Sequence, residues 1–374
     1  MKQVMMALGL AAVVSAALAG PAGRDKQPKG TGRIELSGRV DLDIKPVGPA
    51  RLSPDGRHAL FVQRREAQDY TYHVLDLDSK KATKVFDSTI GWDDMFTVAL
   101  GRGVWSPDGT AFAALTSHNG QPMRKGGAAR MVLADLDKKK QTVLPCQRTL
   151  TIGAVFDRKG NLYYVDMTDP DKEAFRCALR KYDPRTQKVR DVATLDDAAV
   201  IGLTMPPDRS RIGAILVRKA EERRPEMRLW AYDLATARSA QSEPAHFDDY
   251  AFDGAPCLCW DADASALYAN GSKQNDRKKE FSILQFRPFP PGQTKLTVLQ
   301  QKKKMVALDA FAPGRLSVAA WARTKAPEAF VLDVRTDRTT PCNLPLLLVH
   351  RVGRLGLFID PSRRALCTAR ILLR

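Results

Sequence analysis

The stretch Leu52-Ser53-Pro54-Asp55-Gly56 recurs almost unchanged as Trp105-Ser106-Pro107-Asp108-Gly109, and this recurrence decides the fold. Proline pre-sets the φ angle for a tight turn and glycine accepts a positive φ angle, so each copy predicts a hairpin turn. We call this five-residue unit the anchor turn. Short apolar runs follow it, such as Ala59–Val62 and Ala111–Leu115, and unbroken apolarity is typical of strands buried on both faces.

Five weaker copies of the anchor turn extend the pattern to the end of the chain. They are Phe156–Gly160, Met205–Arg209, Trp260–Ala264, Phe311–Gly314 and Ile359–Ser362. The fourth residues of successive copies lie 53, 51, 49, 55, 51 and 48 residues apart. A period this steady indicates a repeat architecture rather than unrelated loops.

The second half of each repeat has its own signature, a strand that ends in Asp followed by an aliphatic residue. The examples are Tyr72–Leu77, Met131–Leu136, Leu229–Leu234 and Ala329–Val334. A polar turn and a fourth strand follow, as in Thr83–Phe86 and Gln141–Leu144. Four strands per repeat, with no long helical periodicity, predict an all-β fold, a β-propeller of seven four-stranded blades, with six blades as the alternative.

The last repeat stops early, and this predicts how the ring closes. Its C-terminal residues supply two strands, around Leu355–Phe358 and Ala365–Ala369. Near the other end of the chain, Arg33–Leu36 and Val40–Ile44 flank Ser37-Gly38 as a candidate hairpin. We expect this N-terminal strand or hairpin to complete the last blade within a single domain over residues 33–374, because closure removes exposed sheet edges.

Residues 1–19 are typical of a secretory signal peptide. Lys2 precedes an apolar run from Val4 to Ala17, and Ala17-Leu18-Ala19 fits a cleavage site before Gly20. Residues 20–32 are rich in Gly, Pro and Lys and predict a flexible lead-in. The sequence therefore predicts a periplasmic or secreted protein with no membrane span after cleavage.

The chain resembles the TolB-like family of bacterial propellers, which is related to WD-type repeats and to the propeller domains of prolyl-oligopeptidase-type proteases. Ser53–Gly56 and Ser106–Gly109 carry the resemblance, together with Asp76-Leu77, Asp135-Leu136 and Asp233-Leu234. It covers residues 48–374 and implies the fold rather than an activity. TolB has an additional α/β domain and the proteases an α/β-hydrolase domain, and this chain has length for neither, nor a Gly-x-Ser-x-Gly elbow.

Three acidic pairs precede anchor turns at similar offsets and are the candidate binding residues. They are Asp93-Asp94, Asp196-Asp197 and Asp248-Asp249, and His118 lies in a predicted loop of the second repeat. Equivalent offsets would place the pairs on one face of the propeller, where they would bind a cation or a basic group. The alternative is that they are solvated turn residues, because Asp is common in turns.

Histidines and cysteines give no further site. The five histidines lack metal-ligand spacing, and His58 and His73 fall beside or within predicted strands, where packing is the expected role. The six cysteines fall mostly in apolar strands and are expected to be buried free thiols, with disulfides as the alternative. No catalytic residue, metal site or cofactor is predicted.

The formal net charge of +17 favours anionic partners. The basic clusters are Arg64-Arg65, Lys80-Lys81, Lys138–Lys140, Arg223-Arg224, Lys278-Lys279 and Lys302–Lys304. No motif for reading nucleic acid is present. We expect a monomeric binding or scaffold propeller that recognises a protein or an anionic envelope polymer through blade loops. The alternative is a hydrolase or lactonase with its site at the mouth of the central channel.

Overall fold

The computed structural model describes most of the chain as β-strands joined by tight turns. The described residues are 32–42, 46–65, 69–89, 103–117, 129–146, 154–167, 176–196, 198–218, 226–247, 258–273, 282–290, 292–299, 304–321, 328–342, 347–352, 355–360 and 365–373. Every regular element within these ranges is a β-strand. None of them contains a helix that is long and apolar enough to cross a membrane.

The first three sheets each contain four consecutive antiparallel strands, as the repeat predicts. Blade 1 contains β2 (Pro46–Leu52), β3 (His58–Arg64), β4 (Asp69–Asp76) and β5 (Ala82–Thr89). Blade 2 contains β6 (Val104–Trp105), β7 (Ala111–Ser117), β8 (Ala129–Asp135) and β9 (Lys140–Val143). Blade 3 contains β10 (Ala154–Phe156), β11 (Leu162–Met167), β12 (Arg176–Asp183) and β13 (Lys188–Asp196).

The next two repeats share one nine-stranded sheet. Its first half, called blade 4 here, contains β14 (Ala198–Thr204), β15 (Arg211–Arg218), β16 (Glu226–Asp233) and β17 (Ser239–Gln241). Its second half, blade 5, contains β19 (Leu258–Trp260), β20 (Leu267–Lys273), β21 (Ser282–Phe286) and β22 (Leu296–Val298). The short strand β18 (Ala245–Phe247) pairs with both β16 and β20 and joins the two halves. The count of seven blades therefore stays a prediction.

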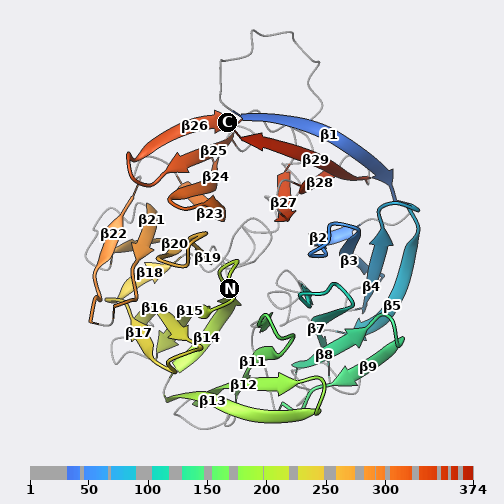
Figure 1. Cartoon of the computed structure of the whole chain (residues 1–374), viewed down its shortest axis with the longest axis horizontal. Coiled ribbons are helices and arrows are strands. Elements are labelled where there is room, and N and C mark those ends of the chain that lie inside the picture. The colour runs from blue at the N-terminus through green and yellow to red at the C-terminus, as the bar shows by residue number, and fades with distance from the viewer. Residues whose placement is uncertain are drawn as a thin grey trace, which may run out of the picture.

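Two four-stranded sheets complete the molecule. One contains β23 (Lys304–Ala312), β24 (Arg315–Trp321), β25 (Glu328–Asp333) and β26 (Arg338–Cys342). The last sheet has the order β1–β29–β28–β27, with strands β1 (Gly32–Asp41), β27 (Leu347–Val352), β28 (Leu355–Asp360) and β29 (Ala365–Leu373). Figure 1 shows all the sheets around a central axis, with β27 near the centre and β1 at the periphery. The predicted all-β propeller is confirmed.

The last sheet corrects two details of the sequence analysis. The expected N-terminal hairpin is wrong, because residues 32–41 form one strand that pairs with β29 and accommodates Ser37 in a β-bulge. The expected place of the seventh anchor turn is also wrong, because Ile359 and Asp360 end β28, which pairs with β27 as the second strand of this sheet rather than the first. The two expected C-terminal strands are β28 and β29, and β27, which precedes them, supplies a third strand to this sheet. The N-terminal strand does complete this sheet, and its role in closing the ring stays a prediction.

The anchor turns have the hydrogen bonds that their sequence predicts. In blade 1 the Ser53 carbonyl accepts the amide of Gly56, and the Ser53 side-chain oxygen accepts the amide of His58 at 2.9 Å. Five anchor turns place their fifth residue at positive φ, namely Gly56, Gly109, Gly160, Arg209 and Ala264, and the shorter copy Phe311–Gly314 does so at its fourth residue, Gly314. Glycine adopts this conformation without steric cost, and the two other residues adopt it because the flanking strands fix the turn.

The hydrophobic core consists of separate clusters between neighbouring sheets. Between blades 3 and 4, for example, the buried residues include Leu179, Ile212 and Trp230. Val40 and Leu42 at the end of the N-terminal segment pack with residues of blade 1 and of β28 and β29. Four cysteines, Cys146, Cys177, Cys259 and Cys367, are buried, as expected for side chains that pack as small apolar groups. Burial between sheets thus provides the main driving force for the ring.

Bulges in two outer strands add polar links between neighbouring blades. Val85 of β5 and Val192 of β13 have no partner in the strand register. The Val85 carbonyl accepts a hydrogen bond from Gln141 Nε2 at 3.1 Å, and the Val192 carbonyl accepts one from the Tyr232 hydroxyl at 3.5 Å. In both cases the donor belongs to the next blade along the chain. The bulge frees a carbonyl that the neighbouring blade then satisfies.

Candidate functional site

The predicted binding residues, the three acidic pairs and His118, all lie outside the described residues except Asp196. Asp93, Asp94, His118, Asp197, Asp248 and Asp249 are all in this group. Asp196 is the last residue of β13, and its Oδ1 lies 2.8 Å from Nε of Arg176 in an exposed ion pair. The acidic binding face, and the binding and hydrolase interpretations that depend on the blade loops, therefore stay predictions.

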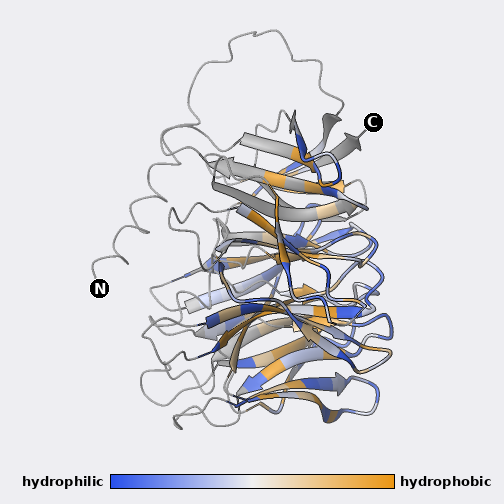
Figure 2. Cartoon of the chain, turned by 90° about the vertical axis from the view of Figure 1, so that its left-hand side faces the viewer, coloured by the Kyte–Doolittle hydropathy of each residue, from blue (hydrophilic) through white to orange (hydrophobic). Residues whose placement is uncertain are grey.

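The two ends of each sheet differ in the kind of connection they carry. The turn between the first and second strands and the turn between the third and fourth strands lie at the same end, because the strands are antiparallel. We call this end the turn face. Its hydrophilic turns lie along the right-hand side of the view in Figure 2. The turn face is well described in every blade from 1 to 5, so a candidate site can be built there.

Carboxylates on the turn face are engaged by the backbone of their own turns. Asp76 Oδ1 accepts the amides of Asp78 and Ser79 at 3.0 and 2.7 Å. Equivalent bonds are made by Asp135, Asp183, Asp233 and Asp333. Backbone amide donors hold the pKa values of Asp76, Asp183 and Asp333 below their ordinary value. The aspartates that end the third strands are thus structural turn residues.

Cations on the same face project into solvent. Lys80 and Lys139 each follow the turn aspartate by four residues at positive φ. The exposed basic residues of blades 1 to 3 on this face include Arg57, Lys80, Lys81, Lys138, Lys139, Lys140, Arg158, Lys159, Arg185, Lys188 and Arg190. Lys138 and Arg185 form exposed ion pairs with their own turn aspartates, Asp135 and Asp183, at 2.8 and 3.7 Å. The other lysines and arginines of this set are exposed, and no ion pair is observed for them among the described residues.

Blade 3 differs from blades 1 and 2 at the second position of its anchor turn. This position holds Ser53 and Ser106 in the first two blades and Asp157 in the third. Asp157 is buried, its Oδ1 accepts the amides of Lys159 and Asn161, and its Oδ2 accepts the side chain of Asn161 at 2.7 Å. A buried carboxylate therefore lies at the base of the blade 3 turn face.

A row of side chains across blade 3 begins beside this carboxylate. The strand register places Tyr163 opposite Lys181, and Lys181 opposite Arg190. Directly opposed residues project from the same side of a sheet, with Cβ atoms about 5 Å apart. Lys181 Nζ lies 3.8 Å from Asp157 Oδ2 and 5.7 Å from the centre of the Tyr163 ring. Two cations are thus cross-strand neighbours on one side of the blade.

Blade 4 contributes two further groups to the junction with blade 3. The Tyr232 hydroxyl reaches the Val192 carbonyl, and Arg209 donates a hydrogen bond to the Phe156 carbonyl at 2.9 Å. Burial raises the pKa of Tyr232, and the nearby Arg190 guanidinium opposes that shift. Burial lowers the pKa of Arg209, and Asp157 opposes that shift. We call Asp157, Tyr163, Lys181, Arg190, Arg209 and Tyr232 the junction cluster.

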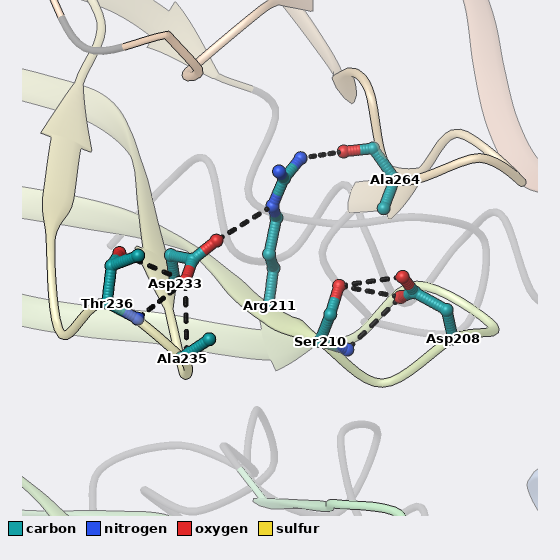
Figure 3. A network of polar contacts seen from close by, with 7 residues as sticks. All are labelled: Asp208, Ser210, Arg211, Asp233, Ala235, Thr236 and Ala264. Carbon is teal, nitrogen blue, oxygen red and sulfur yellow. Dashed lines mark hydrogen bonds and ion pairs between the residues drawn. The ribbon is translucent and has the colours of Figure 1, made fainter.

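Other arginines between neighbouring sheets are neutralised by carboxylates. Arg211 Nε lies 3.3 Å from Asp233 Oδ2, and its guanidinium also donates to the Ala264 carbonyl, as Figure 3 shows. Arg180 forms ion pairs with both Asp166 and Asp191. Among the described residues, Arg190 has no such carboxylate partner. The junction cluster therefore differs from these two sites in carrying positive charge that the described carboxylates do not balance.

Sequence reasoning missed the junction cluster. It identified Phe156–Gly160 only as a weak copy of the anchor turn, although the change from Ser to Asp at its second position was a usable signal. His58 and His73 pack as expected: the His73 ring stacks on Phe61, and its Nε2 lies 3.0 Å from Gln63 Oε1. Within the described ranges, no group of His, Cys, Asp or Glu side chains is placed to hold a metal ion.

Comparison with known proteins supports the fold. No family model matches the sequence, and no curated protein matches it. The β-propeller domain of the Trilobed protease from Pyrococcus furiosus aligns with a TM-score of 0.58 and 10% identity, over 89% of this chain and 99% of that one. An oligogalacturonate lyase from Vibrio parahaemolyticus aligns at 0.54 and 15%, over 92% and 98%.

A prolyl endopeptidase aligns with a TM-score of 0.56 and 14% identity, over 94% of this chain and 56% of that one. A TolB structure is also among the matches. The expected resemblance to this group of propellers is confirmed at the level of the fold. Identities this low show a shared architecture and do not transfer an activity.

Proposed function

We propose that this protein is an exported binding propeller that holds an anionic polymer of the cell envelope against its turn face. The observation that carries the proposal is the separation of charges on that face. Turn aspartates accept backbone hydrogen bonds, whereas the lysines and arginines beside them are exposed. A polymer with repeated negative groups would contact several of these cations at once, and such contacts act together.

The composition of the exposed surface favours a hydrated polymer over a protein partner. Protein interfaces are usually centred on aromatic or aliphatic side chains. Among the described residues, Val143 is the one large hydrophobic side chain that is exposed, at 52%. A surface of charged turns without apolar anchors suits a ligand that is itself charged and hydrated.

The charge of the whole chain supports the same proposal. The formal net charge is +17, and removal of residues 1–19 would take away only the charge of Lys2. A net charge of this size attracts polyanions and speeds their association at low ionic strength. It also implies that salt weakens the complex, because the Debye length falls to about 8 Å at physiological ionic strength.

A titration of the purified protein with two polysaccharides tests the proposal. The probes are polygalacturonate, a linear polycarboxylate, and neutral dextran of similar length, each measured by calorimetry at low and at high ionic strength. We expect binding to polygalacturonate that weakens steeply as salt rises, and no binding to dextran. Equal affinity for both polymers, or affinity that salt does not change, would contradict the proposal, and capture of a protein without any polymer binding would favour a protein partner.

A further inference from the structure

We infer that the junction cluster between blades 3 and 4 is a specific subsite that holds one anionic group of the polymer between Arg190, Lys181 and Arg209. The inference rests on the proposed function and narrows it, because it assigns a defined position to one carboxylate or phosphate group of the ligand. The remaining cations of the turn face would then contribute general electrostatic attraction.

The charge balance of the cluster carries the inference. Lys181, Arg190 and Arg209 bring three positive charges to the cluster and Asp157 brings one negative charge, so the cluster has a net charge of +2, and Lys181 is the cation within ion-pair distance of Asp157. Asp157 already accepts hydrogen bonds from Lys159 and Asn161. Its distance of 3.8 Å from Lys181 Nζ is at the long end for an ion pair. One carboxylate therefore does not neutralise the site.

The strand register makes this imbalance costly. Lys181 and Arg190 are directly opposed in β12 and β13, and like charges in directly opposed positions destabilise a sheet. Both side chains lie on the side of blade 3 that packs against blade 4, where Leu179 and Tyr232 are buried. An anion between the two cations would turn this repulsion into two attractive contacts.

Two tyrosine hydroxyls are placed to support such an anion. The Tyr163 hydroxyl donates to Asp157 Oδ2 at 3.4 Å and the Tyr232 hydroxyl donates to the Val192 carbonyl at 3.5 Å, and both bonds are long. Burial raises the pKa values of both tyrosines, so each hydroxyl keeps its proton and remains a donor at neutral pH. A ligand oxygen in the junction would offer a better acceptor to Tyr232.

The chemistry of the cations defines the ligand as an oxyanion. A guanidinium presents paired N–H groups that match the two oxygens of a carboxylate or a phosphate. Arg190 is exposed and, among the described residues, without a carboxylate partner, so it can adopt that geometry without breaking an existing ion pair. The shared feature of the ligand is thus a repeated planar or tetrahedral oxyanion, which a uronic acid polymer or a polyphosphate would supply.

The test compares Arg190→Gln with Lys139→Gln, each of which removes one positive charge from an exposed position of the turn face. Lys139 is a suitable control because Gln187 occupies the equivalent turn position in blade 3, at φ 55° against 50° for Lys139. Affinities for polygalacturonate and for polyphosphate are measured by calorimetry. The two probes distinguish a carboxylate source from a phosphate source.

We expect Arg190→Gln to weaken binding of the preferred probe about tenfold or more, because a charge-assisted contact is lost. Lys139→Gln should weaken it less than about threefold, as expected for one screened surface charge. Tyr232→Phe should also reduce affinity while leaving the thermal unfolding midpoint within a few degrees. Circular dichroism verifies that each variant is folded.

Equal losses for Arg190→Gln and Lys139→Gln would overturn the subsite and leave the proposed function standing. Absence of binding to either polymer by the unaltered protein would overturn both. If Tyr232→Phe keeps full affinity while Arg190→Gln loses it tenfold, the Tyr232 hydroxyl does not contact the ligand, and the role of Arg190 in the subsite is supported.

Discussion

Asp157 in blade 3 and Asp261 in blade 5 occupy the same position of the anchor turn and use it differently. Asp157 bonds within its own blade, to the amides of Lys159 and Asn161 and to the Asn161 side chain. Asp261 accepts the Tyr268 hydroxyl at 3.0 Å and also the amide of Gly314, 53 residues further along the chain, at 3.0 Å. One carboxylate organises a surface turn and the other connects neighbouring sheets.

The difference shows that the repeats share one turn geometry but differ in the hydrogen bonds that the residue at this position makes. Ser53 supplies a single hydroxyl, which bonds only within its own turn, to the His58 amide and the Asp55 carboxylate. An aspartate supplies four lone pairs, so the same position can also reach a neighbour. In blade 5 the neighbour is the next sheet, and in blade 3 it is a lysine that belongs to a cationic surface.

The largest expected effect comes from deleting the N-terminal strand, which completes the last sheet of the propeller that carries both turns. Deletion of residues 33–46 removes β1, which pairs with β29 along nearly its whole length. It exposes the edge of β29 and part of the cluster around Val40, so the protein should fail to fold or should aggregate. Soluble yield and thermal unfolding measure the outcome. A deletion variant as stable as the intact protein would contradict ring closure by this strand.

The next largest effect should come from Asp261→Ala. The substitution leaves the Gly314 amide and the buried Tyr268 hydroxyl without their acceptor, and Tyr268 also accepts a hydrogen bond from Gln285. We expect a loss of about 3 kcal/mol in the free energy of unfolding. Denaturant titration gives this value. A loss below that of Asp157→Ala would break the proposed contrast between the two blades.

Asp157→Ala should cost less stability and change binding in the opposite direction. The Asn161 donors are buried but the Lys159 amide lies at the exposed end of the turn, and all of these bonds stay within one blade, so we expect a loss of about 1–2 kcal/mol. The same substitution raises the charge of the junction cluster from +2 to +3, so affinity for polygalacturonate should increase. Denaturant titration and calorimetry on one sample measure both changes. Weaker polymer binding by a folded Asp157→Ala protein would contradict the assigned role.

The smallest effect concerns the serine turns at acid pH. Burial raises the pKa of Asp55, but hydrogen bonds from the Ser53 hydroxyl and the Arg57 amide outweigh burial and leave the pKa below its ordinary value. A lowered pKa contributes stability that is complete above the ordinary value, about 3.9, and is lost as the pH falls through the native value.

Ser53→Ala removes one of the bonds that lower this pKa. The variant should be less stable than the intact protein by about 1 kcal/mol at neutral pH, and the difference should shrink as the pH falls below about 4. Denaturant titrations along a pH series measure the difference. A difference that grows with acid would show that the hydroxyl does not act through the Asp55 carboxylate.

The sequence predicted the parts of the fold that depend on neighbouring residues. Ser53–Gly56 and Asp76-Leu77 are local signals, and the structure confirms the turns at both. Ser37-Gly38 was misread because a bulge and a hairpin turn use the same small residues, and only the pairing with β29 distinguishes them. Asp360-Pro361 likewise has turn chemistry, but it follows the second strand of its sheet.

The candidate site was less predictable because it is assembled from residues far apart in the chain. Lys181 and Arg190 become neighbours only through the register of β12 and β13, and Tyr232 joins them from the following blade. The acidic pairs around Asp93, Asp197 and Asp248 stay predictions outside the described residues.

The bulge at Val192 has a consequence for how a bound polymer would be sensed. Its carbonyl holds the Tyr232 hydroxyl across the seam between two blades, and Arg190 lies two residues away on the same strand. A ligand oxygen that accepts a hydrogen bond from this hydroxyl would compete with the Val192 carbonyl for the same donor. Ligand binding would therefore weaken the contact between blades 3 and 4 at this position, while the contacts between the other blades would not change.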